Sequence, residues 1–280
     1  MTDLEHKVRF WGVRGSVPTP TPENLGYGGN TSCLSMALAP DRHLILDCGT
    51  GIRLLGNPLG GERRTGTPMQ FDVLFSHYHL DHIEGLPFFS PLYDPHARIT
   101  FHGFATGGKT VKEILGGIIA PPYFPVPLGE VPSQLRFVTV DGASTLEFGD
   151  VRVDSLPLTH PNGSLSYRLE RAGRKIVYAT DHEHGVAATD SALIRFSEGA
   201  DYLIYDATYV PSEYEMLRRG WGHSTWYEGV HVARAAHVKT LVLFHHHPGH
   251  TDEQLDAVLR VAREELPSVE IAREGLELPL

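Results

Sequence analysis

Four side chains of metal-ligand type lie within six positions, directly after an apolar run at residues 71–75. They are His77, His79, Asp81 and His82. The run predicts a short buried strand, so the four side chains should lie on the loop beyond its carboxyl end. In extended backbone His77 and His79 point the same way and can bind one ion, whereas Asp81 and His82 suit a second ion close by. Because two adjacent cations polarise a phosphoryl group and activate water, this stretch predicts a hydrolytic dinuclear metal site.

The alternative interpretation of these histidines is structural, because a lone histidine is more often a core or surface residue than a ligand. Ligand-type side chains at the ends of other predicted strands argue against it. They are His160, Asp181, Asp206 and His245, at or just after strands expected at 151–156, 175–179, 200–206 and 239–244. The carboxyl ends of strands are where α/β proteins usually place their chemistry, so repeated coincidence is a poor explanation.

The remaining pattern alternates strands and helices. Further strands are expected at 7–13, 33–39, 43–47, 98–103, 134–140 and 145–148, and a hairpin joins 164–170 to 175–179. Helices are expected from Ile83 through Phe89, after Ser224 or Thr225 as far as Ala236, and from Thr251 to Glu265. The proline-rich stretch 119–128 excludes regular helix and central strand. This stretch forms either the wall of a pocket or a subunit contact. The alternative is a surface loop with buried rings.

Length and composition indicate an ordinary globular chain. The 280 residues suffice for one large α/β domain, 1–280, and the formal net charge is −10. Such an acidic surface is a poor partner for large nucleic acids. The chain has only two cysteines, Cys33 and Cys48. Residues 1–6 lack the apolar core of a signal peptide, and no apolar run is long enough to span a bilayer. We therefore expect a cytoplasmic protein that does not bind membranes.

The pattern H-x-H-x-D-H formed by residues 77–82 resembles the signature of the metallo-β-lactamase fold hydrolases. The resemblance covers most of the chain and implies an α/β fold, the four-layer αββα sandwich of the metallo-β-lactamase type. It also implies a ligand set. The first ion would be bound by His77, His79 and His160, the second by Asp81, His82 and His245, and Asp181 would bridge both. His245 is preferred to His246 because it directly follows its strand, and Asp47 would orient ligands from behind the metal loop.

Two loops in the second half resemble the phosphodiesterase branch of that family. Residues 205–208, Tyr-Asp-Ala-Thr, resemble the His-Glu-Ala-Thr loop of ribonuclease Z enzymes, and residues 222–225 resemble their His-Ser-Thr loop. Tyr205 and Asp206 replace the family's His and Glu, so the pairing of Asp206 with His223 is inferred by role. The resemblance implies that metal-bound hydroxide attacks phosphorus, with Asp81 accepting a hydrogen bond from it. His223, oriented by Asp206, would protonate the leaving oxygen.

The expected function is that of a metal-dependent phosphodiesterase acting on a small or cyclic nucleotide-like phosphodiester. Short ribonuclease Z enzymes insert a tRNA-binding arm between the positions that match His160 and Asp181, and here a single hairpin fills that interval. The alternatives are a ribonuclease processing tRNA 3′ ends, or a thioester or lactone hydrolase. A redox di-iron centre is disfavoured because that branch has Glu where His79 stands. Zinc suits the ligands, manganese or iron are possible, and a homodimer is the default expectation.

Overall fold

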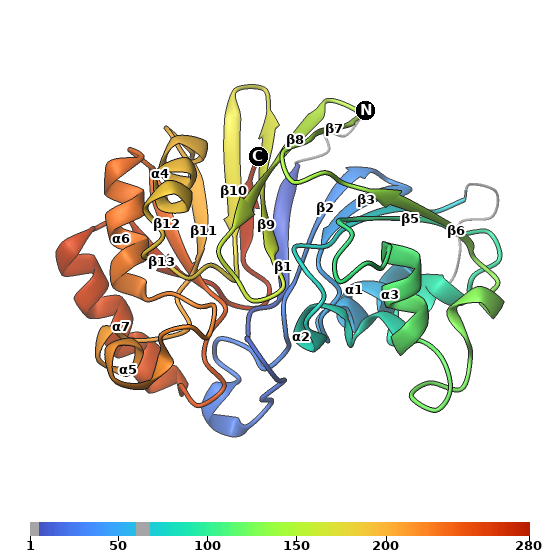
Figure 1. The fold of residues 1–280 in the computed structure, drawn as a ribbon, viewed down its shortest axis with the longest axis horizontal. Helices are drawn as coiled ribbons and strands as arrows, with labels where there is room; N and C mark the ends of the chain where they lie inside the picture. The colour runs from blue at the N-terminus through green and yellow to red at the C-terminus, as the bar shows by residue number, and fades with distance from the viewer. Residues whose placement is uncertain (1–5, 60–67) are drawn as a thin grey trace.

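The computed structural model describes residues 6–59 and 68–280, and these form two seven-stranded sheets packed face to face (Figure 1). The first sheet has the order β14-β1-β2-β3-β4-β5-β6. Its strands are β14 (Glu277–Pro279), β1 (Lys7–Gly12), β2 (Cys33–Ala39), β3 (Arg42–Leu46), β4 (Gln70–Leu74), β5 (Arg98–Gly103) and β6 (Gln134–Thr139). From β3 to β6 neighbouring strands are parallel, so their carboxyl ends lie at one edge.

The second sheet has the order β13-β12-β11-β10-β9-β8-β7. Its strands are β13 (Val269–Ile271), β12 (Thr240–Phe244), β11 (Tyr202–Asp206), β10 (Arg174–Ala179), β9 (Ser164–Arg171), β8 (Val151–Leu158) and β7 (Thr145–Phe148). Strands β10 to β13 are parallel. The expected hairpin is β9–β10, and its turn residues Ala172 and Gly173 both have positive φ, which suits the right-handed twist of the paired strands.

Helices cover the two outer faces of this pair of sheets (Figure 1). They are α1 (Ile52–Leu59) and α3 (Val111–Ile118) on the first sheet, and α4 (Ala187–Phe196), α6 (Trp226–Ala235) and α7 (Asp252–Glu265) on the second. Two short helices, α2 (Leu80–Ile83) and α5 (Pro211–Glu213), lie in the segments that follow β4 and β11. Both predicted C-terminal helices have threonine caps, since the Thr225 side chain accepts from Glu228 N and Thr251 forms a capping box with Gln254. The sequence did not predict α1, α3 or α4.

One helix was wrongly predicted. We expected a helix from Ile83 through Phe89, but α2 begins at Leu80 and ends at Ile83, and a separate 3₁₀ turn, η2, spans Leu86–Phe88. Pro87 explains the interruption, because it has no backbone N–H to donate to the Ile83 carbonyl and so cannot continue the helix. At Gly85 the backbone also comes close to the preceding loop, since an added Cβ would lie 2.0 Å from the Gly49 carbonyl oxygen.

Three separate apolar layers hold the architecture together. The central layer lies between the sheets and includes Phe10, Leu46 and Phe244. A second layer packs α1 and α3 on the first sheet, and a third packs α4, α6 and α7 on the second sheet. Helix, sheet, sheet and helix therefore form four layers with apolar contacts between them. The predicted αββα sandwich is confirmed.

The parallel strands bring the predicted site residues to one edge of the sandwich. Asp47 follows β3, and Asp181, Asp206 and His245 lie at the carboxyl ends of β10, β11 and β12. His77 and His79 lie in the loop after β4 as expected, but Asp81 and His82 lie in α2 and not in the loop where they were predicted. Three of these residues have left-handed backbone, with φ of 60° at Asp47, 53° at Asp181 and 61° at His245. Non-glycine residues rarely adopt this conformation, and it concentrates at functional sites.

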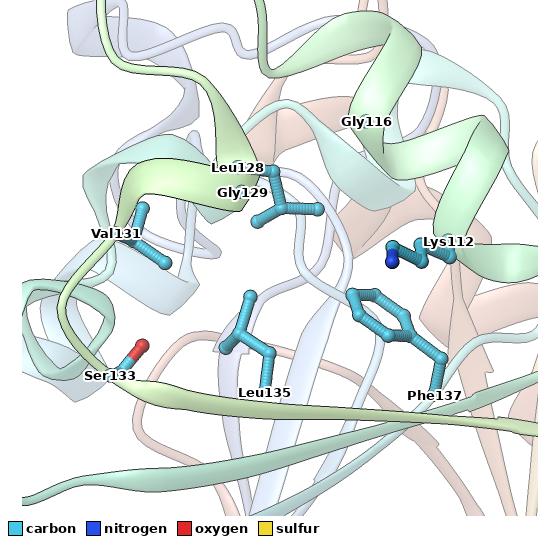
Figure 2. A pocket seen from close by; sticks show the side chains of 8 residues that line it. All are labelled: Lys112, Gly116, Leu128, Gly129, Val131, Ser133, Leu135 and Phe137. Carbon is cyan, nitrogen blue, oxygen red and sulfur yellow. The ribbon is translucent and has the colours of Figure 1, made fainter.

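The proline-rich stretch contains no helix or strand between Ile118, where α3 ends, and Leu128, where the 3₁₀ turn η4 (Leu128–Glu130) begins. Its end forms part of a cavity of about 290 Å³ between α3 and β6, shown in Figure 2. Leu128 and Val131 face Leu135 and Phe137 across this cavity. No predicted site residue lines it, and Leu128 is the one residue of the stretch 119–128 that does. Tyr123 is 79% exposed, so the middle of the stretch is a surface loop.

Two sequence-based expectations concern the chain's environment. The first is that residues 1–6 contain no signal core, and of these Met1 to Glu5 lie outside the described residues. Among the helices of residues 6–59 and 68–280, none is both long enough and apolar enough to cross a bilayer.

Candidate metal centre

All seven predicted ligands lie in one connected cluster. Within each of four overlapping groups, one ligand atom per residue lies within 4.8 Å of the others. The groups are His77, His79 and His160; His77, His82 and Asp181; Asp81, His82 and His245; and Asp181, Asp206, His223 and His245. Side chains from both sheets thus meet at one place, although up to 168 positions separate them in the sequence, from His77 to His245.

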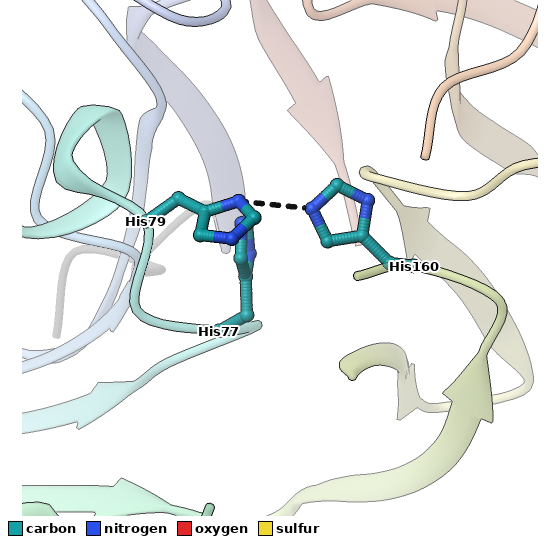
Figure 3. Close-up of side chains that lie close together, drawn as sticks. All are labelled: His77, His79 and His160. Atoms are coloured by element: carbon teal, nitrogen blue, oxygen red, sulfur yellow. Dashed lines mark hydrogen bonds between the residues drawn. The ribbon is translucent and has the colours of Figure 1, made fainter. Parts of the chain in front are cut away.

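The first predicted triad converges as Figure 3 shows. Nε2 of His160 lies 3.0 Å from Nδ1 of His79, and the His77 ring lies against both. The Nε2 atom of His77 is buried and has no hydrogen-bond partner among the described residues. A buried imidazole nitrogen without a partner is costly, so this atom calls for a ligand that the protein itself does not supply.

The second predicted group lies beside the first and shares Asp181 with it. His245 Nε2 lies 3.1 Å from an Asp81 oxygen and 3.3 Å from Nε2 of His82. One oxygen of Asp181 lies 3.6 Å from His77 Nε2, and the other lies 3.1 Å from His82 Nε2. Asp181 therefore stands between the two groups, where a bridging carboxylate was predicted.

His245, and not its neighbour, belongs to the cluster. His246 is also buried, but its Nε2 lies 2.8 Å from the carbonyl oxygen of Ala272. Burial lowers the pKa of His246 to about 3, so the ring stays neutral and donates to that carbonyl. The geometry supports the choice of His245.

Each of four cluster histidines is held by its second ring nitrogen. Nδ1 of His77 lies 3.1 Å from Ser76 Oγ, and Nδ1 of His82 lies 2.9 Å from Asp47 Oδ2. Nδ1 of His160 lies 2.7 Å from the Gly222 carbonyl oxygen, and Nδ1 of His245 lies 3.0 Å from Thr208 Oγ1. These contacts point Nε2 toward the cluster, as partners of metal-bound histidines do. His79 is the exception, because it turns Nδ1 inward.

Asp47 lies behind the metal loop and outside every ligand group. Its two oxygens accept hydrogen bonds from Ser76 N at 2.7 Å, Ser76 Oγ at 2.7 Å and the Tyr178 hydroxyl at 2.8 Å, besides the contact with His82. The side chain is fully buried. Asp47 thus fixes the backbone at the start of the ligand loop and the ring of His82 together.

The electrostatics of the cluster favour cations. Burial lowers the pKa of His77, His79 and His160, which keeps their rings in the neutral form that binds metals. Burial would also raise the pKa of Asp181, but His245, His82 and His77 hold it well below its usual range. The first triad therefore presents neutral imidazoles beside the ionised carboxylate of Asp181.

His82 shows the same preference for positive charge. Burial alone would lower its pKa, but the charges of Asp181, Asp81 and Asp47 raise it well above its usual range. Carboxylates that stabilise a buried imidazolium would also stabilise a cation in its place. The mixed nitrogen and oxygen donors, with the unpartnered His77 Nε2, fit divalent ions such as zinc.

His223 and Asp206 form a pair at the edge of the cluster. His223 Nδ1 lies 2.8 Å from Asp206 Oδ2, and the His223 ring stacks on that of His245 with 4.9 Å between centroids. Burial opposes protonation of His223, yet the charge of Asp206 and its hydrogen bond raise the pKa to about 9. The structure places both predicted residues together, and His223 can hold a proton beside the cluster.

Sequence reasoning missed several residues that shape the site. Ser16 N donates to Asp81 Oδ2 at 2.7 Å, and a Cβ on Gly15 would lie 2.3 Å from the His245 ring. The loop after β1 therefore closes over the second group. Its anchor is the fully buried Arg14, which donates to the carbonyls of Gly28 and His250. The available signal in the sequence was an arginine at the end of an apolar strand. Because arginine is rarely buried without partners, its place there indicates a polar anchor for the following loop.

Comparison with known proteins agrees with this fold. The sequence profile of the family described as "Beta-lactamase superfamily domain" matches residues 42–246. A ribonuclease Z from Haloarcula marismortui is 26% identical over 97% of this chain and 96% of its own length. The metallo-beta-lactamase fold protein YhfI from Bacillus subtilis superposes with a TM-score of 0.72 at 20% identity, covering 98% of each chain. A diphosphatase from the PhnP family gives 0.70 at 18% identity, again over 98% of each chain.

Proposed function

This chain belongs to the family of the beta-lactamase superfamily domain and is a metal-dependent hydrolase, and from that premise we propose that it cleaves a small or cyclic nucleotide-like phosphodiester. The single observation that carries the proposal is the contact of His223 with Asp206 beside the cluster. A phosphodiester with an alkoxide leaving group needs a proton at that oxygen. A thioester or lactone hydrolase of the same fold would not need such an acid.

We assign the seven clustered residues as ligands of two divalent cations, zinc in the first place, with manganese or iron as alternatives. His77, His79 and His160 would hold one ion, Asp81, His82 and His245 the other, and Asp181 both. Bound there, the cations would polarise the phosphoryl oxygens and lower the pKa of water for the attack on phosphorus. Asp81, besides its ligand role, would accept a hydrogen bond from the attacking water.

The chain's own contribution to leaving-group departure comes from His223. Its Nδ1 is engaged by Asp206, so Nε2 carries the transferable proton. Asp206 is itself held by Thr208, whose backbone N and hydroxyl donate to its Oδ1 at 3.0 and 2.8 Å. The proton would pass from His223 Nε2 to the leaving oxygen, a step worth about a hundredfold or more in general acid catalysis.

A small substrate is supported by the segment between His160 and Asp181. The segment contains only the end of a loop and the β9–β10 hairpin with its two-residue turn, so no arm projects there to hold a large RNA. The formal net charge of −10 also disfavours nonspecific contact with a polyanion. Both observations favour a substrate that is recognised at the cluster alone.

A second candidate is a ribonuclease acting on tRNA 3′ ends. The relative from Haloarcula marismortui carries the name ribonuclease Z, and its likeness extends over nearly the whole of both chains. That likeness supports a nucleic acid substrate about as well as the missing arm argues against it. The two candidates share the cluster and the acid, and they differ in what surrounds the phosphoryl group.

The test is a substrate panel measured on chelator-treated protein reloaded with zinc, manganese or ferrous iron. The panel contains cyclic mononucleotides, cyclic and linear dinucleotides, nitrophenyl phosphodiesters, a precursor tRNA, and representative thioesters and lactones. We expect metal-dependent hydrolysis of small diesters with kcat/KM above that for the precursor tRNA. A His77→Ala variant controls for contaminating phosphodiesterase. Turnover of thioesters or lactones without any diester hydrolysis would overturn the proposal, and a preference for the precursor tRNA would select the second candidate.

A further inference from the structure

A hollow of about 190 Å³ opens beside the cluster on the side of the first ligand triad. We call it the aromatic hollow and define it by Tyr78, Phe104, Thr106, Asn162 and Gly163. The rings of His77 and His79 complete its inner wall. A substrate whose phosphoryl group is bound at the cluster would therefore extend one of its substituents directly into this space.

Two fixed aromatic rings make up one wall of the aromatic hollow. The centroids of Tyr78 and Phe104 lie 5.5 Å apart, and the Tyr78 hydroxyl donates to the Phe104 carbonyl at 2.8 Å. Both side chains are only partly buried, so they keep accessible surface. Rings that are held in place before binding lose little entropy when a planar group packs on them.

Glycine keeps this wall open on the opposite side. Gly163 has φ of +86°, and a Cβ built there would lie 3.4 Å from the ring of Phe104. A larger side chain at this position would therefore cover the ring. The glycine conformation and the absence of a side chain together leave Phe104 free for a ligand.

Polar groups stand at the rim of the aromatic hollow. The exposed Asn162 has left-handed backbone, with φ of 66°, and its Nδ2 lies 3.4 Å from His79 Nε2. The Thr106 hydroxyl donates to the Asn162 carbonyl at 3.1 Å, which ties the two rim segments together. An amide and a hydroxyl beside an aromatic wall suit a ring whose face is apolar and whose edge accepts and donates hydrogen bonds.

From these contacts we propose that the aromatic hollow binds one planar, nucleobase-like ring of the substrate, carried on the phosphoryl group that stays in the product. This inference rests on the proposed function, because it takes the cluster as the phosphoryl site. The volume of the aromatic hollow is smaller than the roughly 300–1,000 Å³ of drug-sized pockets, so the hollow accepts one ring system and no longer chain.

The position of His223 assigns the ring to the retained group. The His223 ring contacts those of His160 and His245, whereas the aromatic hollow is lined by His77 and His79. Because the leaving oxygen must face His223 to receive its proton, the substituent on the His77 and His79 side is the one that stays bonded to phosphorus. The predicted product is a phosphate monoester with an aromatic group.

Binding of two simple phosphonates tests the proposal without turnover. Titration calorimetry on the zinc-loaded protein compares phenylphosphonate with methylphosphonate. Since stacking on an aromatic side chain strengthens binding of a base by about fivefold to a hundredfold, we expect phenylphosphonate to bind about tenfold more tightly. Phe104→Ala should reduce this preference to about twofold or less and leave the affinity for methylphosphonate unchanged. Phe124→Ala, in the proline-rich stretch, is the matched control and should keep the full preference.

A second variant guards against misfolding of Phe104→Ala. Thr106→Trp fills the aromatic hollow from its rim and should weaken phenylphosphonate binding alone. Equal affinities of the wild-type protein for both phosphonates would overturn the proposal, as would a preference that survives both variants. Turnover of methyl 4-nitrophenyl phosphate is measured in parallel. If it fails while the phenyl preference is present and sensitive to Phe104, the phosphodiesterase proposal falls and the ring-binding site stands.

Discussion

The carboxylate of Glu183 accepts a hydrogen bond from the backbone N of Gly222 at 2.8 Å. The same carboxylate accepts from Gly220 N at 2.5 Å and from the Tyr214 hydroxyl at 3.0 Å. The carbonyl of Gly222 in turn accepts from His160 Nδ1, and His223 follows directly in the chain. One side chain beside Asp181 therefore fixes the loop that orients a predicted metal ligand and carries the predicted acid.

Glu183→Gln tests this positioning role. The amide cannot accept from all three donors, and each charge-assisted hydrogen bond contributes about 1.5–3 kcal/mol. We expect kcat on an alkyl phosphodiester to fall about tenfold with KM nearly unchanged. A small shift of the loop misaligns His223 for proton transfer but is too small to disturb substrate binding. Steady-state kinetics measure both constants. The exposed Glu198→Gln is the control, and a change in KM alone would show that Glu183 acts on binding instead.

His223→Ala tests the predicted general acid. We expect turnover of an alkyl phosphodiester to fall by about a hundredfold or more, because the alkoxide leaves poorly without a proton. A nitrophenyl diester, whose leaving group needs no proton, should lose far less. The exposed His231→Ala serves as a comparison for loss of a histidine elsewhere. Equal losses on both substrates would remove the acid role.

Metal removal should destabilise the fold at the cluster. A cation that binds only the folded chain stabilises it by about 2.7 kcal/mol at a hundredfold excess over Kd. Adding zinc to chelator-treated protein should therefore raise Tm by several degrees, as measured by calorimetry. Asp181→Ala, which removes the carboxylate between the two ligand groups, should abolish most of the increase. The surface variant Asp150→Ala should keep it, and an unchanged Tm for wild-type protein would contradict the predicted site.

Lowering the pH should reduce the stability of the fold, because Asp154 in the second sheet stabilises it only when its carboxyl group is ionised. Burial would raise the pKa of this carboxyl, but hydrogen bonds from Thr145, Arg168 and Arg152 lower it below its usual value. The folded chain therefore binds this proton less readily than the unfolded chain. The resulting stability is present above about pH 4, the pKa of an unfolded Asp, and is lost as the pH falls further.

Urea denaturation of Asp154→Asn between pH 7 and pH 3 measures this contribution. The variant should be less stable than the wild-type protein at pH 7, and the difference should shrink as the pH falls below about 4. The control is Asp141→Asn, at an exposed position. A difference that stays constant with pH would mean that the asparagine disturbs packing and that the carboxyl charge contributes nothing.

The sequence by itself determined which residues could form the site. Ligand spacing within 77–82 depends only on local backbone geometry, and apolar runs that end at a carboxylate or histidine mark strand ends in any α/β chain. Those two signals identified His77, Asp181 and His245, and the resemblance of their pattern to a known family predicted the confirmed αββα sandwich. The helix predicted from Ile83 through Phe89 was wrong because it contains Pro87, which cannot donate the hydrogen bond that a continuous helix needs there.

Only the tertiary structure decided how these residues are held. The sequence prefers His245 to His246 only because His245 directly follows its strand, and the structure supports that choice by engaging His246 with the Ala272 carbonyl, 26 positions away. The roles of Glu183 and Thr208 depend on contacts between loops that follow neighbouring strands of the second sheet. The aromatic hollow beside His79 depends on loops from both sheets. The physical reason is that hydrophobic periodicity specifies each strand separately, whereas the pairing of polar atoms at the sheet edge depends on the packing of all layers at once.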